Sequence, residues 1–407
     1  MSRKLTKFQR YAILYNVKNT WEHISFKAKW DIDEKTANLL GQCYAYIDSM
    51  LNIPIRPDHH QQLLHVSLNK GALATTAIEG NILTEEDLAL IQSSRDLEPS
   101  RKYQQQEVEN ILAAFNAILA ELVREKKPEI ISPELILRFN KMVGENIGDA
   151  FNGNPGHFRK VNVVVGNIYK PPTSELVEGF VKEFCGWLTR EFHYQQEQNF
   201  DEAVLEAIVS HAYIAWIHPF GDGNGRTARL LEFYILMRAG VPSIASHILS
   251  NHYNNTRTAY YRQLQNATET GNLSAFIQYA LEGFRDGLKN TNAVIHKEQT
   301  ELTWNNYVHD EIEKMQDEGK NQKILRRLRQ LAYYIPRDRY CSLDEIKILN
   351  IKIAEEYLEL NPKALRRDLD LLVAKELLKT EKNKYRANHE LLHGLLPLAS
   401  ISIKRHY

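Results

Sequence analysis

The stretch HPFGDGNGRTAR, residues 218–229, lies between two strongly apolar segments and decides the fold. Upstream, EAVLEAIVSHAYIAWI (202–217) is apolar on nearly every face after its first turn, as in a helix at the centre of a domain. Downstream, RLLEFYILMRAG (229–240) has the same character and ends at a glycine, which is typical of a helix C-terminus. We therefore predict a mostly α-helical protein in which the quoted residues form the loop between two buried helices and the first turn of the second.

The residues of this loop have the chemistry needed to bind a phosphate chain. The run 223–225, Gly-Asn-Gly, lets consecutive backbone N–H groups point toward an anion at the start of a helix, where the helix dipole also favours negative charge. Arg226 and Arg229 would oppose that dipole and repel each other unless a phosphate neutralised them. Asp222 offers the hard carboxylate oxygen that Mg²⁺ prefers, and His218 offers a base that titrates near neutrality. Each residue alone has an ordinary structural explanation, but together they favour nucleotidyl or phosphoryl transfer.

The spacing resembles the signature of the Fic family, His-x-Phe-x-(Asp/Glu)-Gly-Asn-Gly-Arg-x-x-Arg, and departs from it at no specified position. The resemblance implies a helical domain that transfers AMP from Mg-ATP to a Ser, Thr or Tyr hydroxyl of a protein, including itself, and releases pyrophosphate. It implies that His218 is the catalytic base, that Asp222 holds Mg²⁺ and that Phe220 is a buried anchor of the loop. By the same resemblance, Gly223, Asn224 and Gly225 would cradle the phosphates of ATP, and Arg226 and Arg229 would bind its β- and γ-phosphates. The ATP-binding residues of this stretch would be Asp222, Gly223, Asn224, Gly225, Arg226, Thr227, Ala228 and Arg229.

A second segment, FRKVNVVVGNIYKPP (158–172), interrupts the helical pattern with a β-branched run, a central Gly-Asn pair and a double proline. This pattern predicts a small β-hairpin with a two-residue turn. By resemblance, VVVGNIYKPP (163–172) is the family's flap, which lines the nucleotide pocket and can pair with an extended target segment. The flap would contribute Val165, Gly166, Asn167 and Ile168 to ATP binding. By the same resemblance, Tyr260 and Tyr261 would lie beside the adenine of ATP. The alternative is that they belong to a core, as aromatic residues at helical spacing more often do.

A third segment, LATTAIEGNILTEEDL (73–88), places an acid where a helix ends. Glu79-Gly80 closes one helix and Thr84 begins the next, so the carboxylate lies at a C-terminus whose dipole disfavours it. The segment resembles the family's inhibitory motif, (Ser/Thr)-x-x-x-Glu-(Gly/Asn), in which Glu79 would pair with Arg229. The alternative is a solvated Glu79. The resemblance also implies that Glu79 could orient a water that removes AMP from a modified target.

Composition limits the other classes of function. Lys+Arg and Asp+Glu both total 51, so no overall charge attracts nucleic acid or membrane. From Lys320 to Tyr407, however, 19 basic residues face 11 acidic ones, a net charge of +8 that leaves −8 for the remainder. The three widely spaced cysteines form no metal or redox motif, and we interpret them as reduced core residues. Since no segment has the roughly 18 apolar residues of a membrane span or the pattern of a signal peptide, we expect a cytoplasmic protein that does not enter membranes.

The C-terminal residues resemble a bacterial winged-helix domain. SLDE (342–345) is a capping box, and NPKALRRDLDLLVAKELL (361–378) is typical of a recognition helix, with a basic hairpin after it. On that helix Lys363, Arg366 and Arg367 would face outward, although Asp368 and Asp370 interrupt the positive charge. On the wing the cations would be Lys379, Lys382, Lys384 and Arg386. Such a module can contact DNA, dock a protein or form a homodimer.

We therefore expect four regions: an N-terminal helical region with the inhibitory motif (1–105), a Fic catalytic domain (106–290), a helical connector (291–320) and a winged-helix-like domain (321–407). Two functions fit them. One is an autoinhibited AMP transferase that uses Mg²⁺ and ATP and acts on a protein target chosen by the C-terminal module. The other is a DNA-binding regulator that uses the Fic domain as a nucleotide sensor. The intact His218 favours the first, because a sensor does not need a base.

Overall fold

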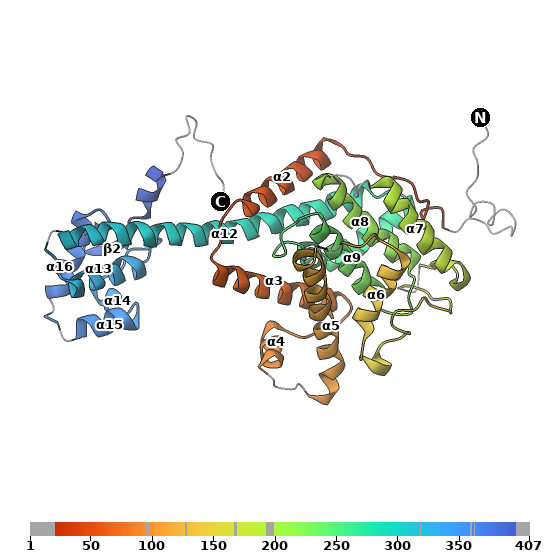
Figure 1. Cartoon of the computed structure of the whole chain (residues 1–407), viewed down its shortest axis with the longest axis horizontal. Coiled ribbons are helices and arrows are strands. Elements are labelled where there is room, and N and C mark those ends of the chain that lie inside the picture. The colour runs from red at the N-terminus through yellow and green to blue at the C-terminus, as the bar shows by residue number, and fades with distance from the viewer. Residues whose placement is uncertain are drawn as a thin grey trace. The chain divides into compact units, whose positions relative to one another are not determined.

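The computed structural model describes residues 21–93, 98–126, 128–166, 169–192, 199–317, 319–358, 360–361 and 363–395. It is mainly helical, and the chain divides into two units, the first ending at Ala293 and the second starting at Val294 (Figure 1). None of the described helices is both long and apolar enough to cross a membrane. Cys43, Cys185 and Cys341 are buried and carry free thiols.

The first unit is built around two helices, α8 (Phe200–Ile217) and α9 (Asn224–Arg238), that pack against each other as the sequence predicts. Asn199 caps the start of α8 by accepting a hydrogen bond from the N–H of Glu202 at 2.8 Å. The helix ends at His218, whose backbone is left-handed (φ 49°, ψ 58°). The loop between α8 and α9 is therefore fixed at both ends by buried helices.

The other elements of the first unit surround this pair (Figure 1). Helix α3 (Pro57–Ile78) packs against α10 (Ile248–Asn255) and α5 (Lys102–Leu119). A Cβ on Gly71 of α3 would lie 2.7 Å from Cβ of His247, so these two segments approach closely there. The long helix α12 begins in the first unit and ends in the second. These elements are α2 (Glu34–Leu51), α3 (Pro57–Ile78), α4 (Glu85–Gln92), η1 (Pro99–Arg101), α5 (Lys102–Leu119), the π-helical turn η2 (Ala120–Arg124), α6 (Pro133–Gly144), η3 (Gly148–Ala150), η4 (Ser174–Leu176), α7 (Val177–Glu191), α10 (Ile248–Asn255), α11 (Arg257–Thr270) and α12 (Ser274–Asp317).

The predicted hairpin at 158–172 is shorter than expected. Among the described residues there it is a single bridge, in which the N–H of Val165 donates to the carbonyl of Tyr169 at 2.8 Å and the reverse bond is 3.0 Å. Three residues separate this pair, so the turn is longer than the predicted two-residue turn. The prolines at 171 and 172 have no N–H to extend the ladder. Two of the predicted flap residues, Asn167 and Ile168, lie outside the described residues.

The second unit includes the end of α12, which differs from the predicted connector at 291–320. Trp304, Val308, Ile312 and Met315 belong to the core of this unit, because the apolar face of α12 continues into it. The remaining elements are α13 (Gln322–Tyr334), α14 (Leu343–Lys347), α15 (Ile351–Leu358), α16 (Lys363–Ala374), the antiparallel strands β1 (Leu378–Glu381) and β2 (Lys384–Ala387), and η5 (His389–Leu395).

Two local predictions for the second unit are confirmed. Ser342 and Glu345 form a reciprocal capping box at the start of α14. The basic hairpin exists, and its turn residues Lys382 and Asn383 have φ values of 48° and 60°, as in a type I′ turn.

Candidate active site

The loop 218–223 begins with His218 at the end of α8, and two hydrogen bonds between the Asn224 side chain and the backbone of Phe220 fix its conformation. The Asn224 side chain accepts from the N–H of Phe220 and donates to its carbonyl, both at 2.9 Å. Phe220 itself is buried, as the resemblance implies. Burial lowers the pKa of His218 to about 4, and the positive charge of Arg159 acts in the same direction. His218 is therefore neutral near pH 7 and able to accept a proton.

The first turn of α9 is already occupied by a carboxylate. Gly223 caps this helix in the left-handed region (φ 76°), where glycine is favoured. A Cβ placed on Gly225 would overlap Oε1 of Glu79, so the carboxylate of Glu79 lies directly over the turn that was predicted to bind an anion. The side chain of Asn224 does not reach outward, because it is engaged with Phe220.

Arg229 joins this carboxylate to the end of α3, a pairing that the family resemblance implies. Its Nη2 donates to Oε1 of Glu79 at 2.6 Å and to the carbonyl of Thr75 at 2.9 Å, and its Nε donates to the Thr75 hydroxyl at 2.8 Å. The side chain of Arg229 is 1% exposed and that of Glu79 is 33% exposed. Burial acts to raise the pKa of Glu79, but the charge and hydrogen bond of Arg229 outweigh it and lower that pKa below its ordinary value. Nη1 of Arg229 is buried and has no hydrogen-bond partner among the described residues.

Arg226 is held by two other carboxylates. It donates to Oε1 of Glu107 at 2.5 Å and to Oδ1 of Asp222 at 2.8 Å, and its side chain is 4% exposed. Oδ2 of Asp222 accepts from the N–H of Asn152 at 3.0 Å. In this state Arg226 therefore neutralises acids of the site rather than facing an open cavity.

The residues present fit a magnesium ion bound together with phosphate. The side chain of Asp222 is 28% exposed and offers hard carboxylate oxygens beside the first turn of α9. Within the described ranges no group of three His, Cys, Asp or Glu residues could hold a metal alone. Phosphate and water oxygens would have to complete the coordination of an ion at Asp222.

Tyr260 and Tyr261, which were predicted to lie beside the adenine of ATP, have different surroundings. Tyr260 is buried, its hydroxyl lies 2.8 Å from Nε2 of His211, and its ring stacks on Tyr253 at 4.9 Å. Tyr261 is 49% exposed, and its hydroxyl donates to the carbonyl of Ile78, the last residue of α3, at 3.4 Å. Of the pair, Tyr261 has a free face that a base could stack on, and Tyr260 supports it from the core.

The other predicted ATP-binding residues lie on α9 and on the flap (163–172). Thr227 and Ala228 are fully buried in α9, and the N–H of Thr227 donates to the carbonyl of Gly223 at 2.8 Å. Val165 is half-buried and forms the flap bridge, and Gly166 follows it with φ 56°. The structure thus brings the loop, the first turn of α9 and Glu79 into contact.

Three residues of this region were missed by sequence reasoning. Glu107 of α5 holds Arg226, as described above. Asn81 donates to the carbonyl of Gln104 and to Oε2 of Glu107, both at 2.9 Å, which fastens the turn after Glu79 to α5. Arg159 donates from Nε to the carbonyl of His218 at 2.8 Å. Nothing in the amphipathic pattern of a single sequence marks these contacts, because each joins segments far apart in the chain.

Comparison with known proteins supports the same assignment. Residues 130–236 match the model of the Fic/DOC family. The chain is 32% identical to "Protein adenylyltransferase fic-1" of Caenorhabditis elegans over 206 residues. This aligned stretch makes up 50% of this chain and 37% of that protein. The chain is 30% identical to "Protein adenylyltransferase Fic" of Nematostella vectensis over 50% of this chain and 44% of that protein. The chain thus spans less than half the length of these relatives.

Solved structures share the fold. A Fic family protein from Desulfovibrio desulfuricans G20 is similar with a TM-score of 0.53 and 17% identity, over 89% of this chain and 98% of that one. A fragment of Fic-1 from C. elegans also has a TM-score of 0.53, with 24% identity over 64% of this chain and 73% of that one. The chain therefore has a mostly helical Fic fold, and the stretch that matches the Fic/DOC family model, residues 130–236, includes the loop from His218 to Arg229.

Proposed function

We propose that this chain is a protein adenylyltransferase that moves AMP from ATP to a hydroxyl side chain of a protein, and that Glu79 holds it in an inhibited state. The observation that carries this proposal is the first turn of α9, where an anion-binding turn and Arg229 are occupied by a carboxylate of the same chain. The relatives named above, at about 30% identity over half of this chain, are protein adenylyltransferases by name and support the type of reaction.

The reaction needs one proton acceptor and a cradle for the leaving group. As the target oxygen attacks the α-phosphorus of ATP, His218 takes the hydroxyl proton, which its neutral state allows. A bond forms between the target oxygen and the α-phosphorus, and the bond from that phosphorus to the β-phosphate oxygen breaks to release pyrophosphate. The N–H groups at the start of α9, with Arg229 once it is free of Glu79, would hold the departing phosphates. Mg²⁺ held by Asp222 and phosphate oxygens would neutralise part of their charge.

Inhibition follows from competition for Arg229. While Nη2 of Arg229 is paired with Glu79, the γ-phosphate cannot take that donor, and the carboxylate lies over Gly225. ATP would then bind with its α-phosphate turned away from the attacking hydroxyl. The same carboxylate would lie close enough to a modified target to orient a water, so removal of AMP is a second reaction that we propose for this site.

The proposal is tested with ATP labelled on different phosphates. The full chain carrying Glu79→Gly is incubated with Mg²⁺ and ATP, and the protein is separated on a denaturing gel. Label on the α-phosphate should remain on the chain through self-modification, and label on the γ-phosphate should not. Transfer of the γ-label would show phosphoryl transfer instead, and no transfer of either label to the chain or to added proteins would contradict the proposed activity.

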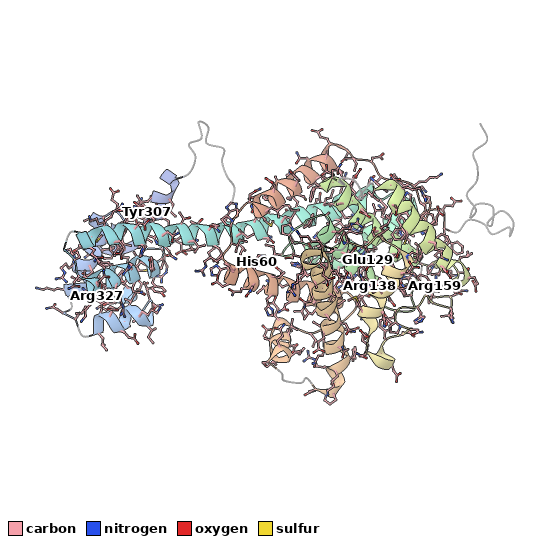
Figure 2. The ribbon with its side chains drawn as sticks, viewed as in Figure 1. His60, Glu129, Arg138, Arg159, Tyr307 and Arg327 are labelled. Carbon is pink, nitrogen blue, oxygen red and sulfur yellow. The ribbon has the colours of Figure 1, made fainter. Side chains whose placement is uncertain are left out.

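One observation favours a second candidate, a DNA-binding regulator. We propose a winged-helix arrangement for the second unit, in which α16 is the recognition helix and the β1–β2 hairpin is the wing. Asp368, which in the sequence interrupts the basic helix, is 1% exposed and accepts a hydrogen bond at 3.0 Å from Nε of Arg327, the residue labelled in Figure 2, so its charge is neutralised inside. Lys363, Arg366 and Arg367 are exposed on α16.

The charge on the wing is only partly available. Lys379 and Arg386 both pair with Glu390, whereas Lys382 and Lys384 are exposed. Binding to a defined duplex that weakens with salt and with Arg366→Ala or Arg367→Ala would support the regulator. Binding that is absent at low salt would exclude it and leave docking of a protein target or dimerisation for this unit.

A further inference from the structure

The flap, residues 163–172, is fastened to α8 by a buried arginine that the proposed reaction does not use. Arg159 is 5% exposed and is labelled in Figure 2. Its Nε donates to the carbonyl of His218 at 2.8 Å, its Nη1 donates to the carbonyl of Val161 at 3.1 Å, and its Nη2 donates to the carbonyl of Pro172. Its own N–H donates to the carbonyl of Pro219 at 3.0 Å.

These contacts fasten the two ends of the flap to the loop 218–223. Val161 comes just before the flap and Pro172 ends it. One guanidinium group therefore joins both ends of the flap to the backbone carbonyl of His218. On the other side, the Tyr169 hydroxyl donates to the carbonyl of Trp216 at 2.7 Å. The last carbonyls of a helix have no partner within that helix, and here Tyr169 and Arg159 bond the carbonyls of Trp216 and His218, which end α8.

The cation itself is unusual. Within the described part of the chain, Arg159 makes no ion pair with a carboxylate, and its partners are backbone carbonyls. The negative charge of Glu175 favours this cation without forming an ion pair with it among the described residues, so part of the cost of burying the charge remains. A planar fork is needed to reach three carbonyls at once. Fixing the flap relative to His218 is a reason for such a cation to be buried here.

We propose that Arg159 is a positioning residue that sets the place of the flap, and so of a target segment paired with it, relative to His218. This inference rests on the proposed transfer of AMP to a protein. A displacement of the reacting groups by about 1 Å can lower a rate about 100-fold, so loss of the forked contacts should reduce transfer strongly.

The experiment compares Arg159→Lys and Arg159→Gln in the full chain carrying Glu79→Gly. Lysine keeps the charge but not the fork, and glutamine loses both. We expect kcat for transfer to a protein target to fall at least about tenfold in both variants and KM for that target to rise, with the affinity for Mg-ATP changed less than about threefold. Arg138→Lys is the control and should change neither rate nor affinity, because Arg138, labelled in Figure 2, pairs with Glu121 elsewhere in the same unit.

A second measurement does not depend on activity. Hydrogen exchange should be at least about tenfold faster at the bridged N–H groups of Val165 and Tyr169 in the Arg159 variants, and unchanged within α8 before its last turn. Tyr169→Phe, which removes the other tie without touching a charge, should also speed exchange and serves if Arg159→Gln does not fold. Normal kcat and KM in Arg159→Lys, or unchanged flap exchange in the variants that fold, would overturn the inference. A Glu79→Gly parent that transfers no AMP would instead overturn the proposed function.

Discussion

Replacing Glu79 by glycine tests the central contact of the site. The change removes the 2.6 Å bond from Nη2 of Arg229 and the carboxylate that lies over Gly225. Arg229 keeps its Nε bond to Thr75, so its guanidinium stays at the start of α9 with Nη1 and one hydrogen of Nη2 available to a phosphate. We therefore expect self-modification to increase.

The size of the increase follows from how the pair is buried. A fully buried ion pair that loses one partner changes the free energy by about 3–5 kcal/mol. The Glu79 side chain is 33% exposed, so solvent screens part of the interaction, and the range for a hydrogen bond to a charged group, about 1.5–3 kcal/mol, is more suitable. At about 1.4 kcal/mol per tenfold change, this predicts a rate increase of about 10- to 150-fold.

The assay measures initial rates of α-label incorporation at saturating Mg-ATP for the wild type, Glu79→Gly and Glu79→Gln. Glutamine keeps the volume over Gly225 and an oxygen for Arg229 but loses the charge, so its rate should lie between the other two. Arg229→Ala should not be activated, since it removes the partner of the inhibitor and a phosphate ligand together. A Glu79→Gly chain that melts normally but is no faster than the wild type would refute autoinhibition by this contact.

Further changes probe the base, the flap, the turn and the buried histidines. His218→Ala should lower AMP transfer by about 10²–10⁴-fold while calorimetry shows nearly normal Mg-ATP binding; an equal loss of binding would contradict its role as base. Val165→Glu should reduce transfer to a protein more than ATP hydrolysis to AMP, and equal losses in both assays would argue against docking on the flap. Asn81→Ala, which frees the turn after Glu79 from α5, should raise self-modification less than Glu79→Gly does, and an unchanged rate would deny the turn that role. Burial lowers the pKa of His23, His218 and His247 from an ordinary value of 6.5 to about 4, so between these pH values the unfolded chain binds more protons than the folded one. The melting temperature should therefore fall from pH 7 to pH 5, and a constant value would contradict the burial of these rings.

The central helices and the loop between them could be predicted because their signals are local. A continuous apolar pattern on either side of a glycine-rich turn leaves few arrangements other than two buried helices joined by that loop. Glu79-Gly80 is also local, since the glycine adopts φ 101° and ends α3. The partner of Glu79 was inferred from a motif rather than from periodicity, because Glu79 and Arg229 are 150 positions apart.

The sequence could not assign each side chain of the motif to an individual contact. Asn224 reads as part of a phosphate cradle, but its amide is used on the backbone of Phe220. Arg226 reads as a phosphate ligand, but in this state it is shared by Asp222 and Glu107, and Glu107 comes from a helix whose pattern shows only amphipathicity. Such pairings are chosen by packing between helices, which one sequence does not reveal.

The contact between Glu79 and Arg229 is also less complete than a motif alone suggests. Oε1 of Glu79 accepts from Nη2 of Arg229, whereas Nη1 of Arg229 is buried without a partner among the described residues, so the pair lacks the two parallel bonds of a bidentate contact. An unsatisfied buried donor costs about 1–3 kcal/mol, and a phosphate oxygen at that nitrogen would remove this cost. The inhibited state that we propose would therefore be held by one charged hydrogen bond between Glu79 and Arg229 and weakened by one missing bond. A small free-energy difference between the inhibited and active arrangements follows, which is why we expect tens to about a hundredfold activation on removing Glu79 rather than the thousands that a fully satisfied pair would predict.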